Sequence, residues 1–287
     1  MKIKPVLSYI LCFITAFFIF IYLLFPQKNA ARLLSASLGQ QNSNLEFSCE
    51  KVKLKIPFKL DVVNSKLLIN KTIELKPESL EINLIPALFS NKSKKIVFCS
   101  DINQGIFKGS LYFQDYSSLL FSKTDLSLSK IKFNNFKYKT DLADIILSCE
   151  VNGEYKYNGI NKTKKGKGSL IIKDFSAKMG NLLFNNLNLS AIDFSEINMD
   201  FYHQSSTINI SHCIARGSVV NIKLNGKITI LPDSNARLDL KGMVLKDSPY
   251  LAKFSSMALV RAVAGNILNQ DIKFTIKGTL HNPKISI

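Results

Sequence analysis

Residues 52–62 read VKLKIPFKLDV, and apolar and charged side chains alternate along them on both sides of Pro57. In an extended strand, successive side chains point to opposite faces, so this period of two gives one apolar face and one wet face. Proline cannot donate a hydrogen bond to a neighbouring strand, so Pro57 interrupts the pattern. The stretch therefore predicts two short, half-buried strands.

The same alternation recurs along most of the chain after Leu45. It is found at residues 73–76, 80–84, 126–128, 131–133, 187–189, 208–210, 222–224, 228–230, 238–240 and 272–276. Asn103-Gln104-Gly105, Asn152-Gly153 and Asn225-Gly226 punctuate it with residues typical of turns or bulges. Many short strands in succession predict an antiparallel meander rather than a parallel sheet with crossover helices.

Helical periodicity is confined to a few stretches. Apolar residues recur at intervals of three and four in residues 27–39, which predicts a short helix ending near Gly39. Residues 85–90 predict one helical turn, and residues 247–269 predict a longer apolar helix capped by Asp247 or Ser248. This is too little helix to cover so many half-apolar strands.

The apolar side of such a sheet has to be hidden from water. Periodicity alone favours a closed sandwich whose apolar faces form an ordinary core. The shortage of helix instead favours a strongly curved sheet with an apolar concave side, which holds lipid or folds on itself. We predict a mainly β fold in which an N-terminal transmembrane helix precedes a curved, largely antiparallel sheet with a few short helices.

The predicted transmembrane helix is a run of twenty residues without a charge, from Val6 to Phe25. At about 1.5 Å per residue, such a run spans a hydrocarbon core of about 30 Å. Lys2 and Lys4 precede it and no acidic residue balances them, so the N-terminus is expected in the cytoplasm and the rest beyond the membrane. The anchor residues are Val6, Leu7, Ile10, Phe13, Ile14, Phe17, Phe18, Ile21, Leu24 and Phe25.

A cleaved signal peptide is the alternative. Its apolar region usually has only about 7–15 residues, and a small-x-small cleavage site follows soon after. The nearest candidate site here, Ser35-Ala36-Ser37, lies too far downstream, so an uncleaved anchor is favoured. The expected organisation is a cytoplasmic stub and anchor at residues 1–27, a helical connector at 28–40 and a periplasmic β-rich domain at 41–287.

The net charge of +17 suggests nucleic-acid binding, but only four of the 38 basic residues are arginine, the usual reader of phosphates and guanines. The predicted topology also places the basic body across the membrane from nucleic acid. We therefore expect no nucleic-acid partner.

Sequence motifs of catalysis are missing as well. The chain has no GxSxG, HExxH or Walker pattern. His203, His212 and Cys213 are too few for a convincing metal site, and the lysine-rich residues 162–168 predict a solvated hairpin loop. We expect no enzymatic activity, no catalytic residue, no metal and no cofactor. The five cysteines include Cys12 in the anchor, and the other four are either paired in disulfides or buried as small apolar residues.

The chain ends in an alternating strand followed by the motif Gly278-Thr279-Leu280-His281-Asn282-Pro283-Lys284-Ile285. This ending resembles the close of AsmA-like periplasmic proteins. The size of the chain, the Phe25-Pro26 exit from the anchor and the predicted helix before the last strand resemble the type II secretion system protein N (GspN) family. The motif residues that carry the resemblance are Gly278, Thr279, Leu280, Asn282, Pro283 and Lys284.

The GspN resemblance implies a single-pass protein of the bacterial inner membrane. The same resemblance implies a role in type II secretion that works through contacts with other secretion-system proteins and without enzymatic activity. The wider AsmA-like resemblance implies the alternative, in which a groove binds or transfers phospholipid in support of the outer membrane. Neither family supplies catalytic residues.

Overall fold

The computed structural model describes residues 3–41, 45–56, 58–69, 73–84, 94–113, 121–139, 144–159, 165–180, 191–231, 235–249, 271–280 and 282–286. The chain divides into two compact units, Met1–Asp101 and Ile102–Ile287, called unit 1 and unit 2 below. Strands form most of the described residues, which confirms the mainly β fold with a large antiparallel sheet and few helices.

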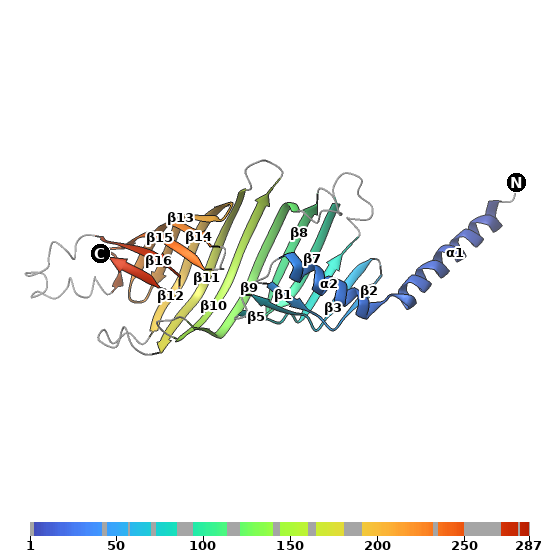
Figure 1. Ribbon diagram of the computed structural model, residues 1–287, viewed down its shortest axis with the longest axis horizontal. Helices are drawn as coiled ribbons and strands as arrows, with labels where there is room; N and C mark the ends of the chain where they lie inside the picture. Colours follow the sequence, from blue (N-terminus) through green and yellow to red (C-terminus); the bar gives the residue numbers. More distant parts are fainter. Residues whose placement is uncertain are drawn as a thin grey trace, which may run out of the picture. The chain divides into compact units, whose positions relative to one another are not determined.

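Unit 1 begins with two helices, α1 (Ile3–Leu24) and α2 (Gln27–Gln41), which meet at Phe25-Pro26 (Figure 1). The amide of Ala30 donates to the carbonyl of Pro26 at 2.9 Å, so proline occupies the start of α2, where its missing N–H costs nothing. The helix expected at residues 27–39 is confirmed and continues to Gln41. Among the residues that the structure describes, none of the helices is both long and apolar enough to cross a membrane.

The strands of unit 1 form two antiparallel groups. One contains β1 (Leu45–Ser48), β4 (Lys66–Ile69) and β5 (Ile73–Leu75) in the order β1-β4-β5. The other contains β2 (Lys51–Lys55), β3 (Lys59–Val63), β6 (Ser79–Asn83) and β7 (Lys94–Ile102) in the order β2-β3-β6-β7. The alternation at residues 52–62 thus forms two paired strands, with Leu54 opposite Leu60.

The core of unit 1 lies between α2 and one face of its strands. Ala31 of α2 is 3% exposed, and Val52 and Val62 of the strands are 1% and 2% exposed. Because alanines face the sheet at Ala30 and Ala31, α2 approaches it closely. The apolar half of the period-two pattern is therefore an ordinary covered core in this unit.

Unit 2 is an antiparallel meander in which every described strand pairs with its neighbours in sequence (Figure 1). Its strands are β8 (Gly105–Phe113), β9 (Phe121–Lys139), β10 (Asp144–Asn158), β11 (Lys165–Gly180), β12 (Ala191–Gln204), β13 (Thr207–Gly217), β14 (Asn221–Ile230), β15 (Ala236–Val244), β16 (Ile272–Thr279) and β17 (Pro283–Ser286). The expected meander is therefore confirmed.

Several of these strands are much longer than the alternating pieces in the sequence. β9 has 19 residues, and bulges interrupt its register with β10 at two places. At each bulge a residue has a left-handed backbone, Lys130 and Asn135 with φ of 53°, and its N–H loses its place in the ladder. The side chain opposite replaces the partner: Asn152 Oδ1 accepts from Lys130 at 2.8 Å, and Ser148 Oγ accepts from Asn135 at 3.1 Å.

Some predictions need correction and others cannot be compared with the structure. The lysine-rich loop predicted at 162–168 is wrong from Lys165 onward, because Lys165–Gly168 belongs to β11, where exposed lysines alternate with buried glycines. Asn103-Gln104 forms the expected turn, with φ of 49° and 65°. The elements predicted at residues 85–90 and 187–189 lie outside the described residues, and so does the helix predicted at 247–269 from residue 250 onward.

Candidate functional site

The antiparallel register of unit 2 aligns apolar residues in three parallel rows on one face of the sheet. Directly paired residues share a face, so each row crosses β9 to β16 without changing side. The central row consists of Leu128, Gly153, Leu170, Met199, Cys213, Leu224, Gly242 and Phe274. The row on one side consists of Ile131, Val151, Ile172, Ile197, Ala215, Ile222, Val244 and Ile272. The row on the other side consists of Leu126, Tyr155, Gly168, Phe201, Ile210, Gly226, Leu240 and Ile276.

We call these three rows the apolar band. The tyrosine hydroxyl of Tyr155 is its one polar side-chain group apart from the thiol of Cys213. The bulges keep the band continuous. Each extra residue shifts the alternation by one position, so the apolar side chains that follow it stay on the same face of the sheet. On β9 the apolar residues are spaced by two and then three, at Leu126, Leu128, Ile131, Phe133 and Phe136. A strict period of two misses this pattern, whereas a search for alternating steps of two and three detects it.

Burial differs along the band. Ile131, Ile210, Cys213, Ala215 and Leu240 are no more than 9% exposed, whereas most of the other side chains are only half-buried. In the described part of unit 2, the extensive contacts between elements are all between neighbouring strands. The described part of this unit thus forms a single layer, without the second sheet of a sandwich.

Glycines within the band make room for rings from neighbouring strands. A Cβ on Gly168 would collide with the ring of Phe201, and one on Gly242 would collide with the ring of Phe274. The rings therefore lie over the backbone of the adjacent strand. The stacked Tyr155 and Phe201 rings, 6.2 Å apart, lie on either side of Gly168 in the register. This arrangement gives the band a continuous surface where a glycine would leave a gap.

The band becomes polar at one margin on β9, β10 and β12, where the next row along the strands contains Thr124, Tyr157 and His203. On β13, β14 and β15 the same row stays apolar, with Ile208, Ile228 and Leu238. The Tyr155 hydroxyl lies 3.1 Å from Nδ1 of His203, and burial raises the pKa of this tyrosine. Rings and hydrogen-bonding groups thus mark the boundary between the apolar band and the polar ends of β9, β10 and β12.

The opposite face of unit 2 carries charged residues. One row alternates in sign across five strands, through Lys132, Glu150, Lys173, Glu196 and Arg216. Opposite charges on paired strands stabilise a sheet by about 0.2–1 kcal/mol per pair, and least where they are exposed. The two faces of the sheet therefore differ sharply in chemistry.

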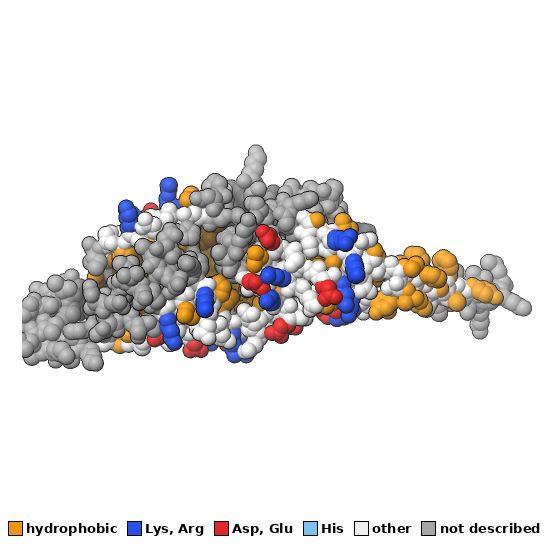
Figure 2. Space-filling view, turned by 60° about the horizontal axis from the view of Figure 1, so that its bottom comes forward, with side chains coloured by type: hydrophobic (Ala, Val, Ile, Leu, Met, Phe, Trp, Pro, Cys, Tyr) orange, Lys and Arg blue, Asp and Glu red, His pale blue; other side chains and the backbone are white. Residues whose placement is uncertain are grey.

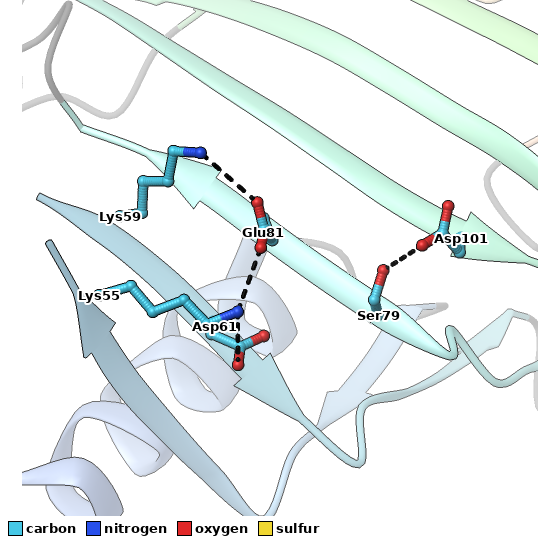
Figure 3. Close-up of polar contacts among 6 residues, drawn as sticks. All are labelled: Lys55, Lys59, Asp61, Ser79, Glu81 and Asp101. Carbon is cyan, nitrogen blue, oxygen red and sulfur yellow. Dashed lines mark hydrogen bonds and ion pairs between the residues drawn. The ribbon is translucent and has the colours of Figure 1, made fainter. Parts of the chain in front are cut away.

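Unit 1 has a polar cluster on the face of its sheet opposite α2 (Figure 3). The ammonium of Lys55 lies 3.1 Å from Asp61 and 3.2 Å from Glu81, while Lys59 lies 3.8 Å from Glu81. The hydrogen bond to Asp61, followed by that to Glu81, raises the pKa of Lys55 above its usual 10.5. Nearby, Ser79 donates to Asp101 at 2.6 Å. These side chains are paired with one another at the surface, which is typical of strand stabilisation rather than catalysis.

Helix α1 exposes large apolar side chains, which appear as an orange surface in Figure 2. Phe13, Phe20, Leu23 and Leu24 are between 63% and 73% exposed, and Phe17 is 54% exposed. Of the other predicted anchor residues, Ile21 is 36% exposed and Phe25 is half-buried against the unit 1 core. Val6, Leu7, Ile10, Ile14 and Phe18 lie on α1, but their side chains are not among those described, and Lys2 lies outside the described residues.

The C-terminal motif forms the turn between β16 and β17. Gly278 has φ of 108°, and a Cβ there would lie 2.6 Å from the carbonyl oxygen of Asn282. The amide of Asn282 donates to Thr279, at 3.1 Å to its carbonyl and 3.2 Å to its hydroxyl. Pro283 and Lys284 begin β17, and Leu280 is 46% exposed between the strands. The motif residues thus have a structural role in closing the last hairpin.

The cysteines are present as free thiols. Burial raises the pKa of Cys49, Cys149 and Cys213, so these thiols remain protonated and weakly reactive near neutral pH. Among the side chains that the structure describes, no three His, Cys, Asp or Glu residues come close enough to hold a metal ion. The apolar band is therefore the most distinctive surface of the described fold.

Comparisons with family models, with curated proteins and with solved structures find no match for this chain.

Proposed function

We propose that the protein is anchored in the inner membrane by α1 and that the apolar band of unit 2 binds phospholipid acyl chains on the periplasmic side. The observation that carries the proposal is the band itself, which is three residues wide, continuous across eight strands and mostly half-buried. Monomeric soluble proteins rarely leave apolar surface of this extent without a ligand or partner.

The dimensions of the band suit lipid. Eight strands about 4.8 Å apart give a length of about 34 Å. An acyl chain in one leaflet extends for about 15 Å, half of the hydrocarbon core. The band therefore has room for chains lying along it, while Tyr157 and His203 at its margin provide hydrogen-bonding groups beside the more polar parts of a lipid. The bulges, which bend strands, support the curved form of sheet that the sequence predicts.

The anchor rests on the uncharged run of residues 6–25, which includes side chains outside the described part, and on the exposed apolar side chains of α1. The lysines at positions 2 and 4 favour a cytoplasmic N-terminus. This orientation places the β-rich part in the periplasm.

Adjacent isoleucines on β11 provide the matched test. Ile172 belongs to the apolar band and is half-buried, whereas Ile171 points to the wet face and is 42% exposed. Native mass spectrometry of the full chain, extracted in mild detergent, is expected to show a phospholipid adduct. Ile172→Asp should reduce the adduct at least tenfold, and Ile171→Asp should retain it. A wild-type chain without bound lipid, or equal retention in both variants, would refute the proposal.

A role in type II secretion through protein contacts stays a prediction that rests on the order of parts along the sequence. It requires the same anchor and the same periplasmic sheet. Crosslinking in a native envelope tests it directly: recovery of secretion-system components supports this role, and their absence counts against it.

A further inference from the structure

The turn between β2 and β3 has an unusual composition. Lys55 pairs with Lys59, so only three residues of the sequence separate the two strands, and the structure describes the first and last of them, Ile56 and Phe58. Loops of this length usually place glycine, asparagine or aspartate where the backbone is left-handed. Here that position is occupied by Phe58, with φ of 53°, and Ile56 beside it is 79% exposed. A bulky residue in this conformation is strained, and strain of this kind is retained mainly at functional sites.

This hairpin tip faces α1 within unit 1. A cavity of about 490 Å³ lies between them and is lined almost entirely by apolar side chains. The helix contributes residues from Thr15 to Leu23, and the hairpin contributes Leu54, Ile56 and Phe58. The tip thus lies alongside the last two to three turns of α1, the part that precedes the Phe25-Pro26 junction.

Charged groups lie immediately behind the tip. Lys51, Lys53, Lys55 and Lys59 occupy the two strands, and Asp61 is the one acidic residue on them. These lysines are largely paired with acids: Lys55, which also borders the cavity, with Asp61 and Glu81, Lys59 with Glu81, and Lys51 with Glu50. An apolar tip followed by charged side chains of both signs matches the interface of a bilayer, in which hydrocarbon gives way to the polar headgroup region.

We infer that the β2–β3 hairpin tip is a second membrane contact, in which Ile56 and Phe58 insert among the phospholipid chains of the leaflet next to the C-terminal end of α1. Lipid chains fill the cavity between the tip and the helix. This inference rests on the proposed membrane anchor and is independent of lipid binding by the apolar band. The contact holds unit 1 against the bilayer surface instead of leaving it tethered by α1 alone.

Tryptophan fluorescence tests the inference, because the chain contains no tryptophan. The full chain is reconstituted into vesicles of phosphatidylcholine and phosphatidylglycerol with and without brominated acyl chains. Each variant contains one new tryptophan: Ile56→Trp at the tip, Phe20→Trp in α1 and, as the control, Ile171→Trp on the wet face of β11, where the side chain is 42% exposed. Phe58→Trp serves as a second tip position.

We expect brominated lipid to quench emission at least twofold in Ile56→Trp and Phe20→Trp, and to leave Ile171→Trp unchanged. If Phe20→Trp is quenched while both tip variants behave like Ile171→Trp, the hairpin lies in water and the inference is wrong, although the proposed anchor is supported. If Phe20→Trp is not quenched, α1 does not lie in the bilayer. The proposed anchor is then wrong, and so is the inference that rests on it.

Discussion

In unit 1, α2 packs on the apolar face of the strands, and Val52 and Val62 are only 1% and 2% exposed. In unit 2, the apolar band is mostly half-buried, and within the described residues no helix packs on it in extensive contact. Both faces arise from alternating apolar and polar side chains. The comparison teaches that alternation determines which side of a sheet is apolar, whereas the elements packed against that side determine whether it is core or binding surface.

The largest expected effect is a loss of stability in unit 1 when a charge is placed on the apolar face that α2 covers. Val62→Asp buries an unpaired carboxylate under α2 and should destabilise unit 1 by about 3–5 kcal/mol. Hydrogen exchange of α2 and β3 amides measures this loss. The control is Val63→Asp, because Val63 is half-buried on the other face, opposite Lys51, and a cost of about 1 kcal/mol or less is expected there. Equal costs would remove the distinction between the two faces of unit 1.

The next prediction concerns the bulges that keep the band in phase. Deleting Lys130 removes the extra residue of one bulge, so part of β9 must turn its apolar side chains to the wet face. A loss of about 3 kcal/mol is expected in unit 2. Lys130→Gly keeps the residue and suits its φ of 53°, so it should change stability by about 1 kcal/mol or less. Chemical denaturation compares the two. A deletion as stable as the glycine variant would show that the bulge does not set the phase.

The smallest effect is expected at the polar cluster of unit 1. The pKa of Lys55 is raised by Asp61 and Glu81, so its pairing stabilises the fold below the ordinary value of 10.5 and is lost as the pH rises through the folded-state pKa. Lys55→Gln should therefore lower the unfolding temperature slightly at pH 7, and the difference from wild type should shrink as the pH rises above 10.5. A difference that grows with pH would contradict the assigned pairing.

Sequence periodicity predicted the strands and the antiparallel order, because the polarity of each side chain indicates whether it lies on the apolar or the wet face of the sheet. It did not predict the length of β9, since Lys130 and Asn135 interrupt the alternation without ending the strand. It misassigned Lys165–Gly168 because glycine between lysines is typical of loops, whereas here the glycines accommodate rings from neighbouring strands. The C-terminal motif was noticed for its resemblance, but Gly278 and Asn282 form a turn that any closing hairpin of this shape requires.

What covers an apolar face is not encoded in the alternation at all. The apolar band depends on register between strands distant in sequence, such as Leu128 with Gly153 and Gly242 with Phe274, and on bulges that restore it. Local periodicity contains none of these pairings. Lipid binding was therefore an expectation from the shortage of helix and from the resemblance, and the geometry of the band became visible only when the strands were aligned.

Photocrosslinking at two adjacent residues of β11 tests the central claim most directly. A benzophenone amino acid replaces Leu170 in the centre of the apolar band or Ser169 on the exposed wet face, and the full chain is irradiated in its native membranes. The account predicts a phospholipid adduct, identified by mass, at position 170 and none at position 169. Crosslinks to protein alone at position 170, or equal lipid adducts at both positions, would contradict it.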